Sequence, residues 1–478
     1  MQTRNLIGGD WVGSDSGRTF DVHDPATDAV IASVPECAAA ETDRAIESAA
    51  RAQERWAALP ARERAGPVRR IGELMIQRRE NLARLLTSEQ GKPLDEARGE
   101  IAYAASFLDW AAGEAQRIYG RTVPPSTPDK RILVLRQPVG VAAAITPWNF
   151  PSAMITRKLG PALAAGCAMV VKPAEQTPLS AIALGELAID AGLPPGLFNI
   201  VTGSPEPIAQ AFLSNPSVRL ITFTGSTEVG RLLMRGAAQN TTRVALELGG
   251  HAPFIVFDDA DLDQAVAGAM ATKFRNMGQT CICANRFYIH ERIHDEFVSR
   301  LVEQAKTLRV GVGTEDGVRI GPLINDAAIQ KVQRHVEDAV NKGATVLTGG
   351  KRVCPGPGLT DRFYAPTVLT DCTPEMLVFS EETFGPVAPI CRFEMENEVI
   401  RRANDTSAGL AAYFFTRDSS RLMRVAEALE YGIVGANDAT PSTAQAPFGG
   451  FKQSGIGREG GAWAMDEYLE TKYVSWKL

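Results

Sequence analysis

Apolar residues recur at helical spacing in the first part of the chain. Intervals of three and four residues place these side chains on one helix face: Ile71, Leu74, Met75, Leu82, Leu85 and Leu86. A second pattern of this kind runs from about residue 93 to residue 118. A link rich in Gly, Pro and Ser, GRTVPPSTPDK, then leads to the strand-like RILVLRQP.

From Val141 onward, short apolar strands alternate with amphipathic helices. The predicted strands are VAAAITPW, AMVVKP, LFNIV, RLITFT and RVALEL. Such alternation indicates βαβ units around a parallel sheet, and so an α/β fold. After GGHAPFIVF a second α/β pattern begins, with a helix over 262–274, so we expect a domain boundary near 249–250. The final YLETKYVSWKL alternates like a strand and needs a sheet to join, for example in another subunit.

Composition is that of an ordinary globular protein. The 478 residues are 45% hydrophobic and 22% charged, with a formal net charge of −6 and dispersed Lys and Arg, which argues against nucleic-acid or membrane partners. No apolar run approaches the ~20 residues that cross a bilayer, and the amino terminus lacks the apolar core of a signal peptide. Seven scattered cysteines suggest free thiols in a reducing compartment. We expect a soluble cytoplasmic protein.

Two glycine-rich stretches could hold phosphate. GIGREG, over 455–460, has the letters of a dinucleotide fingerprint but follows a loop, so a plain glycine-rich turn is favoured. FTGSTEVG instead lies between a predicted strand and a predicted helix. Gly225 would allow a tight turn and Ser226 could donate a hydrogen bond, while the N–H groups of the new helix face an anion such as a pyrophosphate. An ordinary strand-to-helix turn fits these letters equally well.

Lys172 and Glu175 follow a predicted strand in VVKPAEQTP. Ligands of open α/β sheets bind at the carboxyl ends of the strands. A carboxylate there can accept from both ribose hydroxyls of NAD and would repel the extra phosphate of NADP. The alternative is two solvated charges on a loop.

The stretch NMGQTCICANR holds Cys281 and Cys283. Zinc would need four ligands, and none of the five histidines is in a paired pattern, so we expect no metal site. A disulfide between residues two apart would be strained. A nucleophile and a buried structural thiol both remain, and this stretch alone favours the buried thiol.

Residues at two other predicted strand ends could assist a nucleophile. Glu247, in ALELGGHAP, is a candidate general base beside two glycines. Asn149, in TPWNFP, could stabilise an oxyanion between two aromatic residues. A cysteine–histidine hydrolase is less favoured, because only His251 lies near these motifs.

Six motifs together resemble the NAD(P)-dependent aldehyde dehydrogenase superfamily, in order and in spacing. They are TPWNFP, KPAEQTP, FTGSTEVG, LELGGHAP, GQTC and EETFGPV, and the resemblance covers essentially the whole chain. It implies that Cys281 is the nucleophile, that Glu247 activates water, and that Asn149 stabilises the oxyanion together with the Cys281 N–H. It implies cofactor contacts from Thr146, Pro147, Trp148, Lys172, Glu175, Gly225, Ser226, Glu382 and Phe384.

The resemblance also implies the fold and its organisation. We expect a Rossmann-type NAD(P)-binding domain over 1–121 and 139–250 and an α/β catalytic domain over 251–450. A small β oligomerisation element over 122–138 and 451–478 would make a homodimer or homotetramer. The implied reaction passes through a thiohemiacetal and a thioester, and Glu247 favours hydrolysis to a free acid. A structural protein on the same fold would need none of Cys281, Glu247 and Asn149.

Substrate residues follow from the resemblance to succinate-semialdehyde dehydrogenases. Arg157, Arg275 and Ser442 match the residues that bind the substrate's carboxylate in those enzymes. Pro441 and Thr443 depart from their pattern, which leaves 2-oxoglutarate semialdehyde as the next candidate, with glutarate semialdehyde also open. We expect NAD to be preferred over NADP. Cys283 is either a small residue in a tight loop or a redox partner of Cys281.

Overall fold

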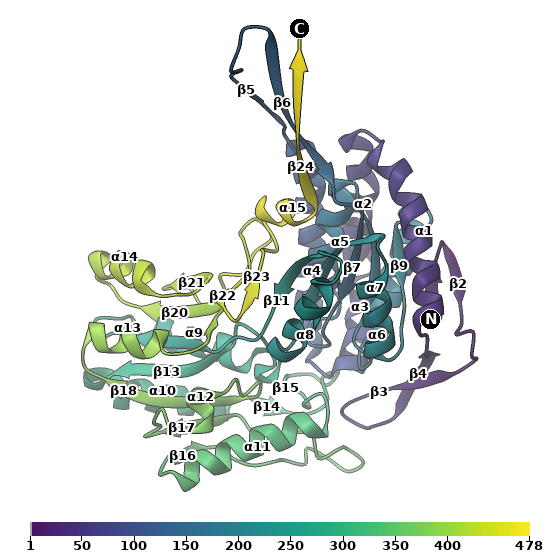
Figure 1. Ribbon diagram of the computed structural model, residues 1–478. Helices are drawn as coiled ribbons and strands as arrows, with labels where there is room; N and C mark the ends of the chain where they lie inside the picture. The colour runs from purple at the N-terminus through teal and green to yellow at the C-terminus, as the bar shows by residue number, and fades with distance from the viewer. Residues whose placement is uncertain (1) are drawn as a thin grey trace.

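Two open α/β sheets form the body of the computed structural model, which describes residues 2–478 (Figure 1). The expected α/β class is confirmed. Each sheet has its own buried apolar core, and the amino-terminal helices share the core of the first sheet. The chain passes between the sheets after Glu247, because β11 belongs to the first sheet and β12 to the second. The chain therefore changes sheets between Glu247 and Ala252.

The first sheet has six strands in the order β23-β11-β10-β7-β8-β9. Its strands are β7 (Val141–Ile145), β8 (Ala168–Lys172), β9 (Phe198–Ile200), β10 (Val218–Thr224), β11 (Arg243–Glu247) and β23 (Gly455–Ile456). All pair in parallel except β23. The intervening helices are α5 (Ala153–Ala165), α6 (Pro178–Asp190), α7 (Pro205–Ser214) and α8 (Thr227–Ala237). Because helices cover a parallel sheet, its strands read as continuous apolar runs such as VAAAI.

The amino-terminal part combines short strands with four helices. The strands are β1 (Asn5–Ile7), β2 (Asp10–Val12), β3 (Thr19–His23) and β4 (Val30–Pro35), which the apolar pattern did not predict. The helices are α1 (Ala39–Ala57), α2 (Ala61–Gln77), α3 (Arg79–Gln90) and α4 (Leu94–Glu114), followed by the 3-10 turn η1 (Ala115–Arg117). The predicted helical face over 71–86 is confirmed, but Arg78 leaves helical geometry at φ −104° and ψ 17° and divides it between α2 and α3.

The second sheet has seven strands in the order β16-β17-β18-β13-β12-β20-β21. They are β12 (Ala252–Val256), β13 (Ala284–His290), β16 (Thr345–Thr348), β17 (Thr367–Thr370), β18 (Val387–Phe393), β20 (Ala411–Phe415) and β21 (Ile433–Ala436). Its longer helices are α9 (Leu262–Phe274), α10 (His294–Lys306), α11 (Asp326–Asn341), α13 (Glu396–Asn404) and α14 (Ser419–Ala428). The predicted helix over 262–274 is α9.

Short elements complete the chain. They are η2 (Arg275–Gly278), η3 (Glu291–Ile293), β14 (Arg309–Val310), β15 (Val318–Ile320), α12 (Leu377–Ser380), β19 (Ala408–Gly409), β22 (Phe451–Lys452) and α15 (Trp463–Glu467). Among residues 2–478, none of the helices is both long and apolar enough to span a bilayer.

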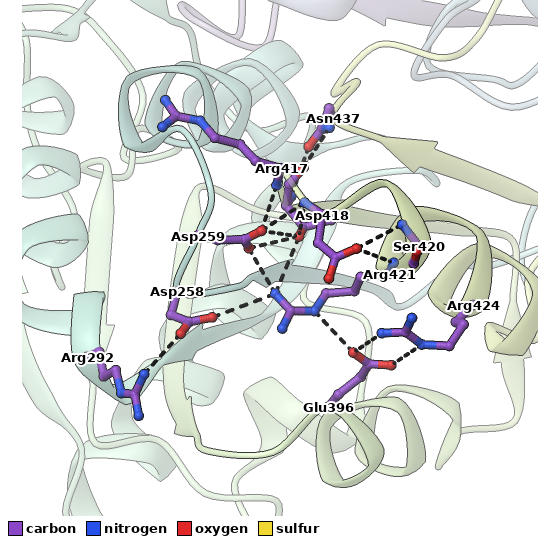
Figure 2. A network of polar contacts seen from close by, with 11 residues as sticks. Asp258, Asp259, Arg292, Glu396, Arg417, Asp418, Ser420, Arg421, Arg424 and Asn437 are labelled. Atoms are coloured by element: carbon purple, nitrogen blue, oxygen red, sulfur yellow. Dashed lines mark hydrogen bonds and ion pairs between the residues drawn. The ribbon is translucent and has the colours of Figure 1, made fainter.

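Arg421 joins the outer helices of the second half to its sheet. Its Nη1 lies 2.9 Å from Oδ1 of Asp259, which follows β12, and its Nε lies 3.1 Å from Oε2 of Glu396 on α13. Figure 2 shows this guanidinium between the acids of two chain segments, Asp258 and Asp259 after β12 and Glu396 on α13. Asp418 caps α14 by accepting from the backbone N–H groups of Ser420 and Arg421. The network ties α13 and α14 to the segment that follows β12.

A three-stranded antiparallel arm extends away from the body (Figure 1). It consists of β5 (Arg121–Val123), β6 (Lys130–Pro138) and β24 (Leu469–Lys477) in the order β24-β6-β5. The strand predicted at the carboxyl end therefore joins a sheet of its own chain. Of the segment 451–478 expected in this element, only 469–477 pairs in the arm. The strands β22 and β23 pair with β19 and β11 of the body, so that expected boundary is corrected.

Candidate active site

Cys281 lies where two cavities meet. One cavity, of about 270 Å³, is lined by Cys281 and by the residues Tyr103, Arg157, Arg275, Ser442 and Phe448, among others; we call it the arginine cavity. The other, of about 380 Å³, is lined by Cys281 and by Trp148, Asn149, Gly225, Ser226, Glu382 and Phe384, among others; we call it the glycine-loop cavity. One thiol thus faces two separate spaces, as a reaction between two molecules requires.

The loop before Cys281 is tightly packed against the end of the first sheet. A Cβ atom on Gly250 would lie 2.1 Å from the Cys281 carbonyl oxygen, so only glycine allows this approach. The predicted proximity of LELGG and GQTC is therefore a backbone contact.

Asn149 is held by hydrogen bonds through both its side-chain amide and its backbone carbonyl. Its Nδ2 donates to the carbonyl of Gln279 over 3.0 Å. Its own carbonyl accepts from Lys92 Nζ at 2.7 Å and from Asn276 Nδ2 at 3.0 Å. These contacts place the carboxamide beside the stretch that leads to Cys281, with its second N–H left to donate.

Glu247 ends β11 in a buried position. No residue of the described chain, 2–478, donates a hydrogen bond to either carboxylate oxygen. Burial raises the pKa of Glu247 well above its usual value, and the nearby charge of Glu459 raises the pKa further. Glu247 lines neither cavity, although its charge reaches the Cys281 thiol. A carboxylate in this setting is a strong base that lacks a fixed partner.

The two cysteines of the motif differ in their surroundings. Burial raises the pKa of Cys281 to about 12, and the charge of Arg157 acts in the opposite direction. Cys283 is 1% exposed and lines neither cavity. Its thiol lies 3.6 Å from the carbonyl oxygen of Lys273, to which it donates. Both thiols are free.

Two arginines lie on the walls of the arginine cavity. Arg275 is half-buried, with its guanidinium carbon 5.5 Å from the centre of the Phe150 ring. Within residues 2–478, its guanidinium makes no ion pair or hydrogen bond, but the carboxylate of Glu96, which lines the same cavity, is close enough to interact with its charge. Arg157 is 1% exposed, and its guanidinium lies 3.8 Å from the centre of the Phe448 ring. Its Nη2 also lacks a hydrogen-bond partner in the described chain.

Two residues at or next to this cavity were not anticipated, Tyr103 in its lining and Glu459 beside Arg157. Ser442 Oγ lies 2.5 Å from the hydroxyl oxygen of Tyr103 on α4. Glu459, in the GIGREG stretch, has its Oε2 2.8 Å from Nε of Arg157 and also pairs with Lys158. The stretch begins with the short strand β23 instead of forming only the turn that was expected, and its buried Glu459 contacts Arg157, a residue of the cavity lining. An acid among glycines was the only signal in the sequence, and it does not name its partners.

The glycine-loop cavity suits an extended polar ligand with an anionic centre. Gly225 and Ser226 lie at the start of α8, where free backbone N–H groups favour an anion. Ser226 Oγ accepts from Val229 N–H, which leaves its hydroxyl hydrogen free to donate. Trp148 and Phe384, which also line this cavity, pack edge to face with their ring centres 5.6 Å apart.

Glu382 and the β8 residues occupy different parts of this region. Glu382 Oε1 accepts from Gly250 N–H at 3.2 Å, and burial raises the pKa of Glu382 to about 7. Lys172, at the end of β8, forms an ion pair with Glu175. Lys172, Glu175 and Thr146 lie outside the cavity lining, at the carboxyl ends of β8 and β7. The described part of the chain has no group of three or more His, Cys, Asp or Glu side chains placed for a metal.

Comparison with known proteins agrees with this arrangement. The profile of the aldehyde dehydrogenase family matches residues 11–474. The chain is 57% identical to a glutarate-semialdehyde dehydrogenase of Pseudomonas aeruginosa, over 98% of this chain and 96% of that protein. It is 55% identical to the NADP(+) succinate-semialdehyde dehydrogenase of Escherichia coli, with the same coverage. The crystal structure of a succinate-semialdehyde dehydrogenase from Burkholderia pseudomallei superimposes with a TM-score of 0.97 at 55% identity, over 99% of this chain and 98% of that chain.

Three findings agree with one another. Cys281 lines both cavities, the buried Glu247 carboxylate has no hydrogen-bond partner in residues 2–478, and the family profile matches nearly the whole chain. The chain belongs to the aldehyde dehydrogenase family of NAD(P)-dependent oxidoreductases.

Proposed function

We propose that this enzyme oxidises a short aldehyde with a carboxylate at its far end, with succinate semialdehyde as the first candidate. The observation that carries this proposal is the pair of arginines on the cavity that reaches Cys281. Arg275 makes no ion pair or hydrogen bond in the described chain, although the charge of Glu96 acts on it, and Nη2 of Arg157 has no hydrogen-bond partner there. A buried or half-buried cation without a partner is costly, and a substrate carboxylate would supply charge-assisted hydrogen bonds to both.

In this proposal Cys281 attacks the aldehyde carbon as a thiolate. The developing oxyanion accepts from the Asn149 carboxamide and from the Cys281 N–H. The resulting thiohemiacetal loses hydride and becomes a thioester. Bound NAD(P)+ supplies the hydride acceptor, held by the glycine-loop cavity.

Glu247 would then take a proton from the water that attacks the thioester. Its raised pKa makes it a good acceptor of that proton, and both of its oxygens are free to bind water. Because Glu247 lines neither cavity, its carboxylate has to turn toward Cys281 for this step. The product is the free acid, and the thiol is regenerated.

Glutarate semialdehyde is the second candidate substrate. The Pseudomonas aeruginosa relative at 57% identity carries that substrate in its name. The two substrates differ by one methylene, which a pocket of this kind distinguishes by about 10- to 200-fold at most. Ser442 and Tyr103 line the same cavity, so one additional methylene would change how the substrate fits against them. Substrate length therefore has to be measured, with 2-oxoglutarate semialdehyde in the same series.

For the cofactor, we propose contacts from the cavity residues and from the β8 end. The start of α8, with Gly225 and Ser226, would hold the pyrophosphate, and Glu382 the ribose beside the nicotinamide. Lys172 and Glu175 would hold the adenosine ribose, with Thr146, Pro147, Trp148 and Phe384 completing the site. The Glu175 carboxylate supports a preference for NAD, because it would repel a 2′-phosphate. A higher kcat/KM with NADP than with NAD would contradict this preference.

The arm supports the proposal of a homo-oligomer, either a dimer or a tetramer. Trp476 and Tyr473 of β24 are 58% and 61% exposed, which leaves large aromatic side chains for a second subunit to cover. Light scattering after size exclusion would give the number of subunits. A cytoplasmic location stays a prediction from the free thiols.

The test of the proposed function is NADH formation over a series of aldehydes. Semialdehydes of four and five carbons with a terminal carboxylate are compared with uncharged aldehydes of the same length. The carboxylate should raise kcat/KM by about 10- to 150-fold, the effect of one or two charge-assisted hydrogen bonds. Cys281→Ala should remove all activity and leave the fold intact. Equal kcat/KM for charged and uncharged aldehydes would contradict the substrate class, and activity in Cys281→Ala would contradict the mechanism.

A further inference from the structure

A lysine and a glutamate form a fully buried ion pair at the edge of the arginine cavity, whose lining includes the glutamate. Lys92 lies in the link between α3 and α4, and Glu100 lies on α4. Both side chains are 0% exposed, with 2.6 Å between Nζ and Oε2. Gly91, at φ 88°, ends α3 in the left-handed region and turns the chain so that Lys92 points inward.

Both partners of this pair contact one short segment of the chain, 149–153. Lys92 Nζ donates to the Asn149 carbonyl at 2.7 Å and lies 3.9 Å from the centre of the Phe150 ring. Glu100 Oε1 accepts from the backbone N–H groups of Ser152, at 3.0 Å, and Ala153, at 3.2 Å. The pair therefore holds both ends of the turn that carries Asn149 from β7 into α5.

A buried ion pair is a poor source of stability in itself. Removing two charges from water costs as much as their attraction returns, and apolar residues of similar volume often serve as well. What this pair provides that apolar residues cannot is a set of directed hydrogen bonds to the backbone of Asn149, Ser152 and Ala153. Its contribution is therefore to position, rather than to stabilise.

We propose that Lys92 and Glu100 are positioning residues that fix the Asn149 carboxamide where the oxyanion develops. This inference rests on the oxyanion role proposed for Asn149. Lys92 Nζ and Asn276 Nδ2 both donate hydrogen bonds to the backbone carbonyl of Asn149. The backbone of Asn149 therefore has little freedom to move. The carboxamide is then aimed by a fixed backbone and by its bond to the Gln279 carbonyl.

The consequence is a loss of rate rather than of binding. A preorganised oxyanion donor displaced by about 1 Å can cost about 100-fold in rate. The double variant Lys92→Met/Glu100→Gln removes both charges, and its glutamine oxygen can still accept from Ser152 and Ala153. We expect kcat to fall about 10- to 100-fold in this variant, with the KM for the cofactor unchanged. Lys92→Met, which removes the donor to Asn149 and leaves Glu100 without its ion-pair partner, is measured beside it, and the urea midpoint of each variant separates a loss of fold from a loss of position.

A matched control comes from a second buried glutamate of the same chain. Glu89 is 0% exposed and accepts from the backbone N–H groups of Leu179, at 2.8 Å, and Ser180, at 2.9 Å, at the start of α6. It thus holds a helix start as Glu100 does, away from Asn149. Glu89→Gln should leave kcat within about twofold. An equal loss of kcat in Glu89→Gln would show a general loosening and overturn the inference.

The decisive experiment is a double-mutant cycle with Asn149→Ala, measured by kcat for the semialdehyde. In the wild-type background the loss from Lys92→Met/Glu100→Gln should be about 10- to 100-fold; in the Asn149→Ala background it should be within about twofold, because nothing remains to be positioned. Equal losses in both backgrounds would overturn the inference, as would a wild-type kcat in the double variant. If Asn149→Ala itself keeps a wild-type kcat, the proposed role of Asn149 fails, and the inference fails with it.

Discussion

Arg157 Nε lies 2.8 Å from Oε2 of Glu459, so this arginine already has an anionic partner. The same carboxylate pairs with Lys158, and all three side chains are buried. Arg157 therefore joins α5 to the GIGREG stretch, lines the arginine cavity, and keeps its Nη2 without a hydrogen-bond partner in the described chain. Arg275 is left as the cation of the arginine cavity that makes no ion pair or hydrogen bond in the described chain.

Removing the Glu459 charge should destabilise the protein. Glu459→Gln leaves Arg157 and Lys158 buried with no paired anion, and breaking a buried ion pair in this way costs about 3 kcal/mol or more. The urea midpoint of unfolding should fall accordingly. Glu470→Gln serves as control, because its pair with Arg243 is largely exposed and should contribute less than about 1 kcal/mol. Equal midpoints for the two variants would contradict the buried-network account.

The same substitution should shift the pH dependence of thioester hydrolysis. Glu247 acts as a base only when deprotonated, so the rate should fall as the pH falls through its raised pKa and level off above it. The charge of Glu459 contributes to that raised pKa. In Glu459→Gln the acid limb of the deacylation rate, read after an NADH burst, should move to lower pH. An unmoved limb, or one at higher pH, would contradict the coupling of the two acids.

The free enzyme should react slowly with alkylating agents at neutral pH. The thiolate is the reacting form, and burial raises the pKa of Cys281 to about 12. The rate of alkylation of Cys281 by iodoacetamide, in the absence of cofactor, should therefore rise about tenfold per pH unit between about pH 7 and 9. Peptide mass spectrometry separates Cys281 from the exposed Cys354. A plateau in the Cys281 rate below pH 8 would show a thiol already ionised.

Cys283 can be tested as a partner of Cys281. Its thiol is buried and donates to the Lys273 carbonyl, so pairing would require this side chain to leave its site. We expect peroxide inactivation to be recovered by dithiothreitol to the same extent in wild type and in Cys283→Ala. A recovery that is lost in Cys283→Ala would instead establish the disulfide switch.

Secondary structure in the βαβ region could be predicted because each buried strand is an uninterrupted apolar run between amphipathic helices. The amino-terminal strands could not, because β2 and β3 are short, partly exposed and polar. The break at Arg78 also has no sequence signal, since the apolar face continues across it.

The proposed catalytic trio of Cys281, Glu247 and Asn149 could be picked out because each member lies in a motif at a strand end or next to one. The contacts that set its properties were not, because they join residues far apart in the chain. The fold brings Glu459, in the GIGREG stretch, against Arg157 on α5. It likewise brings Lys92, in the link between α3 and α4, against the carbonyl of Asn149. Arg157 fitted the substrate pattern, yet its partial engagement by Glu459 depends on packing that no local pattern encodes.

Arg275 is the residue proposed to select a carboxylated aldehyde. This role is tested by comparing kcat/KM for succinate semialdehyde with kcat/KM for an uncharged four-carbon aldehyde, in wild type and in Arg275→Met. We predict that the substitution lowers kcat/KM for the semialdehyde about 10- to 100-fold and leaves the uncharged aldehyde within about twofold, so that the preference disappears. An equal loss for both aldehydes, or no loss for either, would contradict the claim.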